Sequence, residues 1–395
     1  MTADWSWLRD NQAAIAAGGL AMLVGIGLSR FAYAPLIPAL IDAQWFSPVQ
    51  AAYLGAANLL GYLFGALSAA RLTERFGVRA VVGASLATIT LSFLFCAWNL
   101  GFYWFFSWRL LAGTCGAILM VVAPSVALSA TVPQQRAMVG PIVFGGVGIG
   151  AMLSALVIPL LIEFDLRVTW LLLGLLALLV SLLCDRAMRR LPLPSQAPGV
   201  APSGQWFNPA GLSIVVVILM VAYALDAIGF LPHTVFWVDF LAREADFGQL
   251  AASKQWALFG LGALVGPLLT GLLVRSLGWQ RSLCLAFVVK GLAVFLPLLS
   301  LALWSQSVSS FLVGALSPGL SALMAGRLME LVGVSAHRRV WGLATAVFAT
   351  IQAIAAYGMS AFYASSLTYS PLFVVGGLAL SMGAALVWTS ARVGR

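Results

Sequence analysis

Long apolar stretches recur along the whole chain, and they constrain its fold more than any other feature. Hydrophobic residues make up 62% of the 395 residues, whereas charged residues make up only 8%. Because a soluble domain carries about 25% charged residues, this chain would lack the polar surface that keeps a protein in water. The sequence therefore predicts an integral membrane protein and excludes an ordinary soluble enzyme.

Each apolar stretch is long enough to cross a bilayer, because about 20 helical residues span a hydrocarbon core of about 30 Å. No alternating strand pattern competes with the helical interpretation. We predict an all-α integral membrane protein whose twelve transmembrane helices lie near residues 13–41, 49–70, 79–98, 102–128, 137–162, 168–185, 211–239, 249–273, 282–302, 306–326, 339–363 and 371–391.

The net charge of +9 does not require a nucleic-acid partner, because the cations lie mostly in alternate connections. One set of connections holds only Arg167, Arg243 and Lys254. The other set holds fifteen arginines: Arg9, Arg71, Arg75, Arg79, Arg136, Arg186, Arg189, Arg190, Arg275, Arg281, Arg327, Arg338, Arg339, Arg392 and Arg395. By the positive-inside rule, we expect a multi-pass protein of a bacterial inner membrane with both termini in the cytoplasm.

The chain also has an internal duplication. Its longest charged and proline-rich connection, residues 186–209, separates two sets of six predicted helices. We therefore expect an N-terminal bundle over residues 1–185, a cytoplasmic linker over 186–209 and a C-terminal bundle over 210–395. Weak matches at an offset near 200, such as AYAP at 32–35 against GFLP at 229–232, indicate two pseudo-symmetric halves. Transporters built from such repeats bind substrate near the bilayer midplane, between the repeats.

Two further segments carry a resemblance to a known family. The turn at 70–79 resembles the G-x-L-x-D-R-x-G-R-K/R loop of the major facilitator superfamily, with Ala70 and Glu74 replacing the first Gly and the Asp. Residues 109–117 resemble that superfamily's R-x-x-x-G-x-G-x-A pattern, although the second glycine is displaced by one position. The resemblance implies a twelve-helix transporter.

Residues 25–35 and 57–65 are similar to the YbfB/YjiJ-like branch of bacterial transporters in this superfamily. In the fifth span, Gly140-Pro141 and the glycines after it resemble the Gly-Pro-rich element of drug/proton antiporters, with a longer spacer. These small residues indicate close packing and a flexible gate, in which we include Pro141.

The charged turn has a physical rationale as a gate. Glu74 can pair with Arg75, Arg79 or a cation beneath a neighbouring helix, and Gly77 permits a reversal that a Cβ would oppose. We expect these four residues to latch one conformation. The alternative is that the turn serves only membrane topology.

Four ionisable residues interrupt the apolar spans, and each is a functional candidate because a charge in hydrocarbon is costly. They are Arg30, Arg109, Asp226 and Lys290. The alternatives are structural ion pairing or, for Lys290, a side chain that reaches along its helix to the membrane interface.

Three cations against one acid predict a cavity of positive potential and an anionic or zwitterionic substrate. A guanidinium can donate two hydrogen bonds to a carboxylate or phosphate. We assign substrate binding to these two arginines and to uncharged polar or aromatic side chains at similar depth. The predicted substrate-binding residues are Arg30, Arg109, Tyr33, Asn58, Tyr62, Tyr223 and Gln352.

Asp226 and His233 are seven residues apart, which places them on one face of a helix about two turns apart. Burial favours the protonated form of a carboxyl group, and histidine titrates near neutral pH without help. We predict that this pair carries protons as the coupling ion. Pro232 lies between them and would bend the face.

The sequence thus predicts a secondary transporter that moves a small organic anion or zwitterion by alternating access, without a cofactor or metal. The alternative within transport is proton-driven efflux of amphipathic or cationic compounds. An intramembrane enzyme would need a catalytic motif such as H-E-x-x-H or G-x-S-x-G, and the chain has neither. A membrane sensor would need a signalling domain, for which no predicted connection is long enough.

Overall fold

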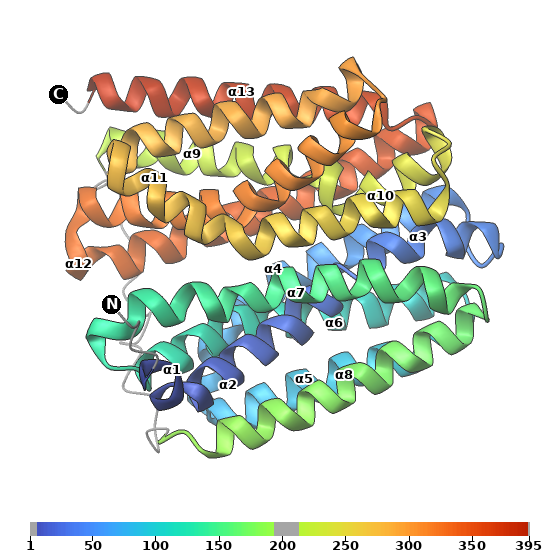
Figure 1. Ribbon diagram of the computed structural model, residues 1–395, viewed down its shortest axis with the longest axis horizontal. Coiled ribbons are helices and arrows are strands. Elements are labelled where there is room, and N and C mark those ends of the chain that lie inside the picture. The colour runs from blue at the N-terminus through green and yellow to red at the C-terminus, as the bar shows by residue number, and fades with distance from the viewer. Residues whose placement is uncertain (1–5, 193–212, 394–395) are drawn as a thin grey trace.

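The computed structural model describes residues 6–192 and 213–393, and this part of the chain consists of helices joined by short turns, with no strand (Figure 1). In the first half the elements are α1 (Ser6–Asp10), α2 (Gln12–Met22), η1 (Leu23–Leu28), α3 (Tyr33–Asp42), α4 (Pro48–Phe76), α5 (Val78–Phe95), α6 (Phe102–Ser129), η2 (Pro133–Gln135), α7 (Arg136–Ile162) and α8 (Leu166–Arg189). In the second half they are α9 (Ile214–Gly229), η4 (Pro232–Phe236), α10 (Trp237–Asp239), η5 (Phe240–Glu244), α11 (Gly248–Leu299), α12 (Leu303–Ser366) and α13 (Ser370–Val393).

The described residues contain 11 helical segments that are long and apolar enough to cross a membrane. One of them, α11, has 52 residues, which is far more than a single crossing needs. Its backbone is non-helical at Gly278, where φ is 76°, so α11 folds back and crosses twice. Gly333 divides α12 in the same way, with φ of 73°, and its two parts are already counted separately among the 11, so that the total is twelve. The predicted all-α membrane fold with twelve crossings is confirmed.

The two halves of the chain form two groups of helices that lie one above the other in Figure 1. Helix α7 packs against α11, and α4 packs against α12, across the boundary between them. Glycines allow the first contact to be close, since a Cβ on Gly148 would lie 2.5 Å from the backbone nitrogen of Leu264. The predicted domain boundaries remain predictions, because residues 193–209 of the expected linker lie outside the described residues.

The first span of each half is interrupted near its middle. In the N-terminal half, a π-helix leads into a turn at residues 29–32 before α3 begins. In the C-terminal half, α9 ends at Gly229, and a π-helix begins at Pro232. The two matched sequences, AYAP and GFLP, lie at these interruptions. Transporter spans of this kind free backbone groups only where protein or a cavity can satisfy them.

The two halves also meet at the end of the molecule where α3 and α10 lie, which we call the far end because α1 begins and α13 ends at the opposite one (Figure 1). Residues 31–40 and 229–242 are buried on every side there. Within the described chain, the only side-chain hydrogen bonds between the halves run from Gln249 to the carbonyl of Pro35, at 2.6 Å, and from Trp256 to the carbonyl of Phe31, at 3.2 Å. This conformation is therefore closed at the far end.

Candidate functional site

Arg30 lies at the interruption of the first span. Its Nε and Nη2 atoms are buried without a hydrogen-bond partner. Three aromatic rings surround its guanidinium carbon, with centroids 5.6 Å away for Phe31, 5.8 Å for Tyr62 and 5.1 Å for Phe230. Aromatic faces attract a cation but do not neutralise it. Phe230 belongs to the other half of the chain, so this charge lies at the boundary between the halves.

Arg109 reaches the same region from α6 and is only 3% exposed. Its Nη1 donates to the carbonyl of Ser29 at 2.7 Å, and its guanidinium lies 4.2 Å from the ring centroid of Tyr33. The Nε atom has no partner. The fixed hydrogen bond orients the guanidinium and leaves a donor free.

Both arginines line one cavity of about 10 Å³, which is roughly the space of a single water molecule. In the described part of the chain neither guanidinium forms an ion pair with a carboxylate. The cavity has net positive charge and unused donors, and both halves contribute to its wall. Its lining residues are Arg30, Tyr33, Ala34, Gly55, Asn58, Leu59, Arg109, Thr234 and Val235.

Close contact between α4 and α6 holds Arg109 in place. Asn58 donates from Nδ2 to the carbonyl of Arg109 at 3.2 Å. A Cβ on Gly113 would lie 1.9 Å from the carbonyl oxygen of Asn58, and one on Gly61 would lie 2.0 Å from that of Leu110. The glycine that follows Arg109 by four residues is therefore needed for α4 to approach, and the Asn58 side chain spans the two helices.

Asp226 and Lys290 form a buried ion pair. Lys290 Nζ lies 2.7 Å from Asp226 Oδ1, and the two side chains are 0% and 2% exposed respectively. Of the two alternatives considered for Lys290, the structure shows the ion pair. The lysine side chain does not extend along its helix to the membrane interface. The lysine also lies 5.4 Å from the ring centroid of Phe230, the ring that contacts Arg30.

His233 lies two turns from Asp226 but makes its hydrogen bond elsewhere. Its Nε2 is 2.7 Å from Ser309 Oγ, and that hydroxyl donates to the carbonyl of Ala293 at 2.7 Å. Because the hydroxyl has only one proton, Nε2 carries the hydrogen of this contact. The other nitrogen, Nδ1, is buried without a partner. No hydrogen bond joins His233 to Asp226 in the described residues.

The remaining predicted substrate residues occupy different surroundings. Tyr33 donates from its hydroxyl to the carbonyl of Ala51 at 2.9 Å, beside the cavity. Tyr223 donates to Ser321 at 3.0 Å within the C-terminal half. Gln352 is 0% exposed, and both atoms of its amide lack partners. The structure thus brings Arg30, Arg109, Tyr33 and Asn58 together in the cavity wall and places the ring of Tyr62 against Arg30. Tyr223 and Gln352 lie outside the cavity wall.

The predicted gating residues lie at the end of the molecule opposite the far end. Glu74 and Arg75 are exposed, and Glu74 has no ion pair in the described chain. Gly77 has φ of 81°, as a tight reversal between α4 and α5 requires. Arg79 donates to the carbonyl of Leu191, 3.1 Å away, and so reaches the end of α8. Pro141 lies inside α7.

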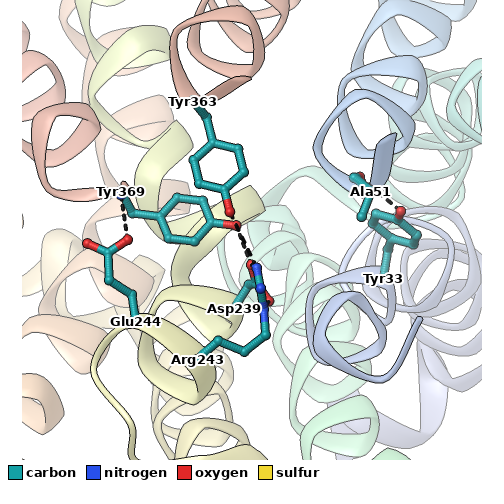
Figure 2. A network of polar contacts seen from close by, with 7 residues as sticks. All are labelled: Tyr33, Ala51, Asp239, Arg243, Glu244, Tyr363 and Tyr369. Carbon is teal, nitrogen blue, oxygen red and sulfur yellow. Dashed lines mark hydrogen bonds and ion pairs between the residues drawn. The ribbon is translucent and has the colours of Figure 1, made fainter. Parts of the chain in front are cut away.

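The sequence did not predict a polar cluster at the far end of the C-terminal half (Figure 2). Asp239 is 0% exposed and accepts hydrogen bonds from Arg243 and from the hydroxyl of Tyr369. Glu244 accepts from the backbone N–H of Tyr369 at 2.6 Å, and Tyr363 stacks on Tyr369 with centroids 4.2 Å apart. The spacing of four between Asp239 and Arg243 is the only signal in the sequence.

Comparison with known proteins identifies the family of this chain. The chain is 26% identical to the tetracycline resistance protein, class C, of Escherichia coli over 330 residues, which cover 80% of this chain and 81% of that protein. A family model described as "Uncharacterised MFS-type transporter YbfB" matches residues 22–388. The chain therefore belongs to the YbfB-type family of major facilitator superfamily transporters, and it is not an enzyme.

Proposed function

We propose that this transporter carries a small organic anion or zwitterion and that Arg30 and Arg109 hold the anionic group between the two halves. One observation supports this most strongly: the buried Arg109 and the partly buried Arg30 line one cavity, and neither guanidinium forms an ion pair with a carboxylate of the described residues. Such charges are costly inside a membrane unless a ligand or water meets them. A carboxylate would accept charge-assisted hydrogen bonds from both.

The rest of the substrate would lie among aromatic side chains. The rings of Phe31, Tyr62 and Phe230 surround Arg30, and Tyr33 lies against Arg109. Flat apolar groups pack well against such rings. We therefore infer that a ring-bearing carboxylate would bind here once the halves move apart and widen the cavity, which in this conformation holds about one water molecule. Benzoate is a suitable probe.

We further propose that protons drive the transport through Asp226, with His233 as its partner in the relay. Supporting features are the isolation of the Asp226 carboxylate from water and the open Nδ1 of His233. The two halves would rock as six-helix bundles and expose the site alternately. Glu74, Arg75, Gly77, Arg79 and Pro141 are the proposed gate. The excess of arginine on one set of connections supports cytoplasmic termini.

A thermal-shift measurement with benzoate tests the anion site, because a ligand of the folded state raises apparent stability. Wild-type protein should be stabilised by benzoate. The Arg30→Gln variant should need at least about tenfold more benzoate for the same shift, since one lost charge-assisted hydrogen bond is worth about 1.5–3 kcal/mol. Arg71→Gln, an exposed site on α4, is the matched control. Equal shifts in all three proteins would contradict the proposal.

A second candidate function is export of an amphipathic compound, which the similarity to a tetracycline resistance protein favours. In that case Asp226 would be the charge that binds a cationic group. The ion pair with Lys290 opposes this, because Lys290 already occupies the carboxylate. Competition distinguishes the two functions: a cationic dye that displaces benzoate in the wild type, but not in Asp226→Asn, would favour export.

A further inference from the structure

The ion pair of the C-terminal half adjoins the arginine site of the N-terminal half through one aromatic ring. The centroid of Phe230 is 5.1 Å from the guanidinium carbon of Arg30 and 5.4 Å from Lys290 Nζ. Two cations thus meet the same ring. The charge of one is open to an anion, whereas the charge of the other is cancelled by Asp226 at 2.7 Å.

We propose that Lys290 is a third cation of the anion site and that a proton on Asp226 switches it on. When Asp226 is ionised, the pair has no net charge. When the carboxylate takes up a proton, an O–H bond forms, the ion pair is lost, and the positive charge of Lys290 is no longer balanced. The net charge beside Arg30 then rises by one. This inference rests on the proposed anion site.

The arrangement makes proton uptake and anion binding favour each other. An anion at Arg30 stabilises an uncompensated Lys290, and a proton on Asp226 creates one. Because linkage is reciprocal, the factor by which protonation tightens anion binding equals the factor by which the anion tightens proton binding. Proton and anion would therefore occupy the transporter together and cross in the same direction.

Among the side chains that the structure describes, few other ionisable groups face Asp226. Lys290 comes from α11, and Tyr223 lies three residues earlier on α9. On α12, the ring of Trp341 lies against Tyr223, and His337 stacks on Trp341. Trp341 therefore separates His337 from Tyr223. Helix α13 packs on this region through uncharged residues, with Leu380 against Gly229. His233 follows in η4, where it is held by Ser309.

The experiment is isothermal titration of the full-length protein with benzoate over a series of pH values. One linked proton makes the wild-type dissociation constant rise by about tenfold per pH unit above the titration range of Asp226. Asp226→Asn should bind benzoate tightly at every pH, because Lys290 is always uncompensated. Lys290→Gln should bind weakly at every pH. These opposite, pH-independent affinities separate the proposal from a purely structural role.

Two further variants complete the test. Lys290→Arg keeps the charge and should keep the pH dependence, while Lys254→Gln, which alters the chain's other lysine, should behave as wild type. A wild-type pH dependence in Lys290→Gln would overturn the proposal. Wild-type binding of benzoate that does not change with pH would also overturn the proposal. The proposed anion site would stand in that case. If the wild type does not bind benzoate at any pH, the anion site itself is wrong.

Discussion

At the scale of single residues, the four charged side chains inside the spans form two groups. Asp226 and Lys290 form an ion pair, whereas Arg30 and Arg109 form no ion pair in the described chain. Asp226 and Lys290 satisfy each other, whereas Arg30 and Arg109 have only rings, carbonyls and a cavity. A buried ion pair adds little net stability, because desolvation offsets the attraction, but a single buried charge without its partner is strongly destabilising. The two pairs should therefore respond differently to mutation.

The Asp226–Lys290 pair gives a prediction for stability. Asp226→Asn or Lys290→Gln alone should lower the free energy of unfolding, and Asp226→Asn should cost about 3–5 kcal/mol because it strands a buried lysine. The double variant should recover much of that loss. Denaturation of the purified protein in mixed micelles measures all four forms. Additive losses in the double variant would mean that the two residues do not act as a pair.

The sequence was sufficient to find these residues but not to pair them. Each of the four interrupts an apolar run, so its depth in the membrane could be predicted from its position in the span. Asp226 and Lys290 are 64 positions apart, and their contact depends on how α9 packs against α11. Nothing local in the sequence encodes that contact. Gln352 and Tyr223 were grouped with the arginines because they lie at a similar depth in their spans. Depth does not specify toward which neighbouring helix a side chain points, and neither residue lies in the cavity wall.

At the scale of elements, interrupted helices and glycine contacts create the site. The turn at residues 29–32 sets Arg30 between the halves, and the break after Gly229 places Phe230 opposite it. The internal matches at 32–35 and 229–232 lie at these breaks, but they predicted only that the two halves are similar and not where a helix is interrupted. They did not predict the π-helices, because these depend on the packing of neighbouring spans.

The contact between α7 and α11 gives a prediction for packing. Gly148→Ala should lower the free energy of unfolding by about 1–3 kcal/mol, because its Cβ would overlap the backbone of α11 at Leu264. Gly358→Ala is the matched control, since no atom lies within 4 Å of its added Cβ. Thermal unfolding of the two variants measures the difference. Equal stability would mean that the close approach at Gly148 is not required.

At the scale of the whole molecule, the positive site lies between two halves that are closed at the far end. Hydropathy and the duplication predicted the twelve crossings and the meeting of the halves near Arg30. The direction of closure could not be predicted, because it depends on contacts such as that of Gln249 with Pro35, across 214 positions of the chain. In this conformation a substrate at the arginines could not leave through the far end, and the two halves would have to rock before that end opens.

The most direct test of the central claim is the position of a bound anion. Crystals of the protein soaked with 4-iodobenzoate, with diffraction recorded for the anomalous signal of iodine, would locate the probe. We expect its carboxylate within hydrogen-bonding distance of Arg30 and Arg109, and its ring against Tyr62 or Phe230. An iodine site elsewhere in the bundle, with the arginine cavity empty of probe, would contradict the account.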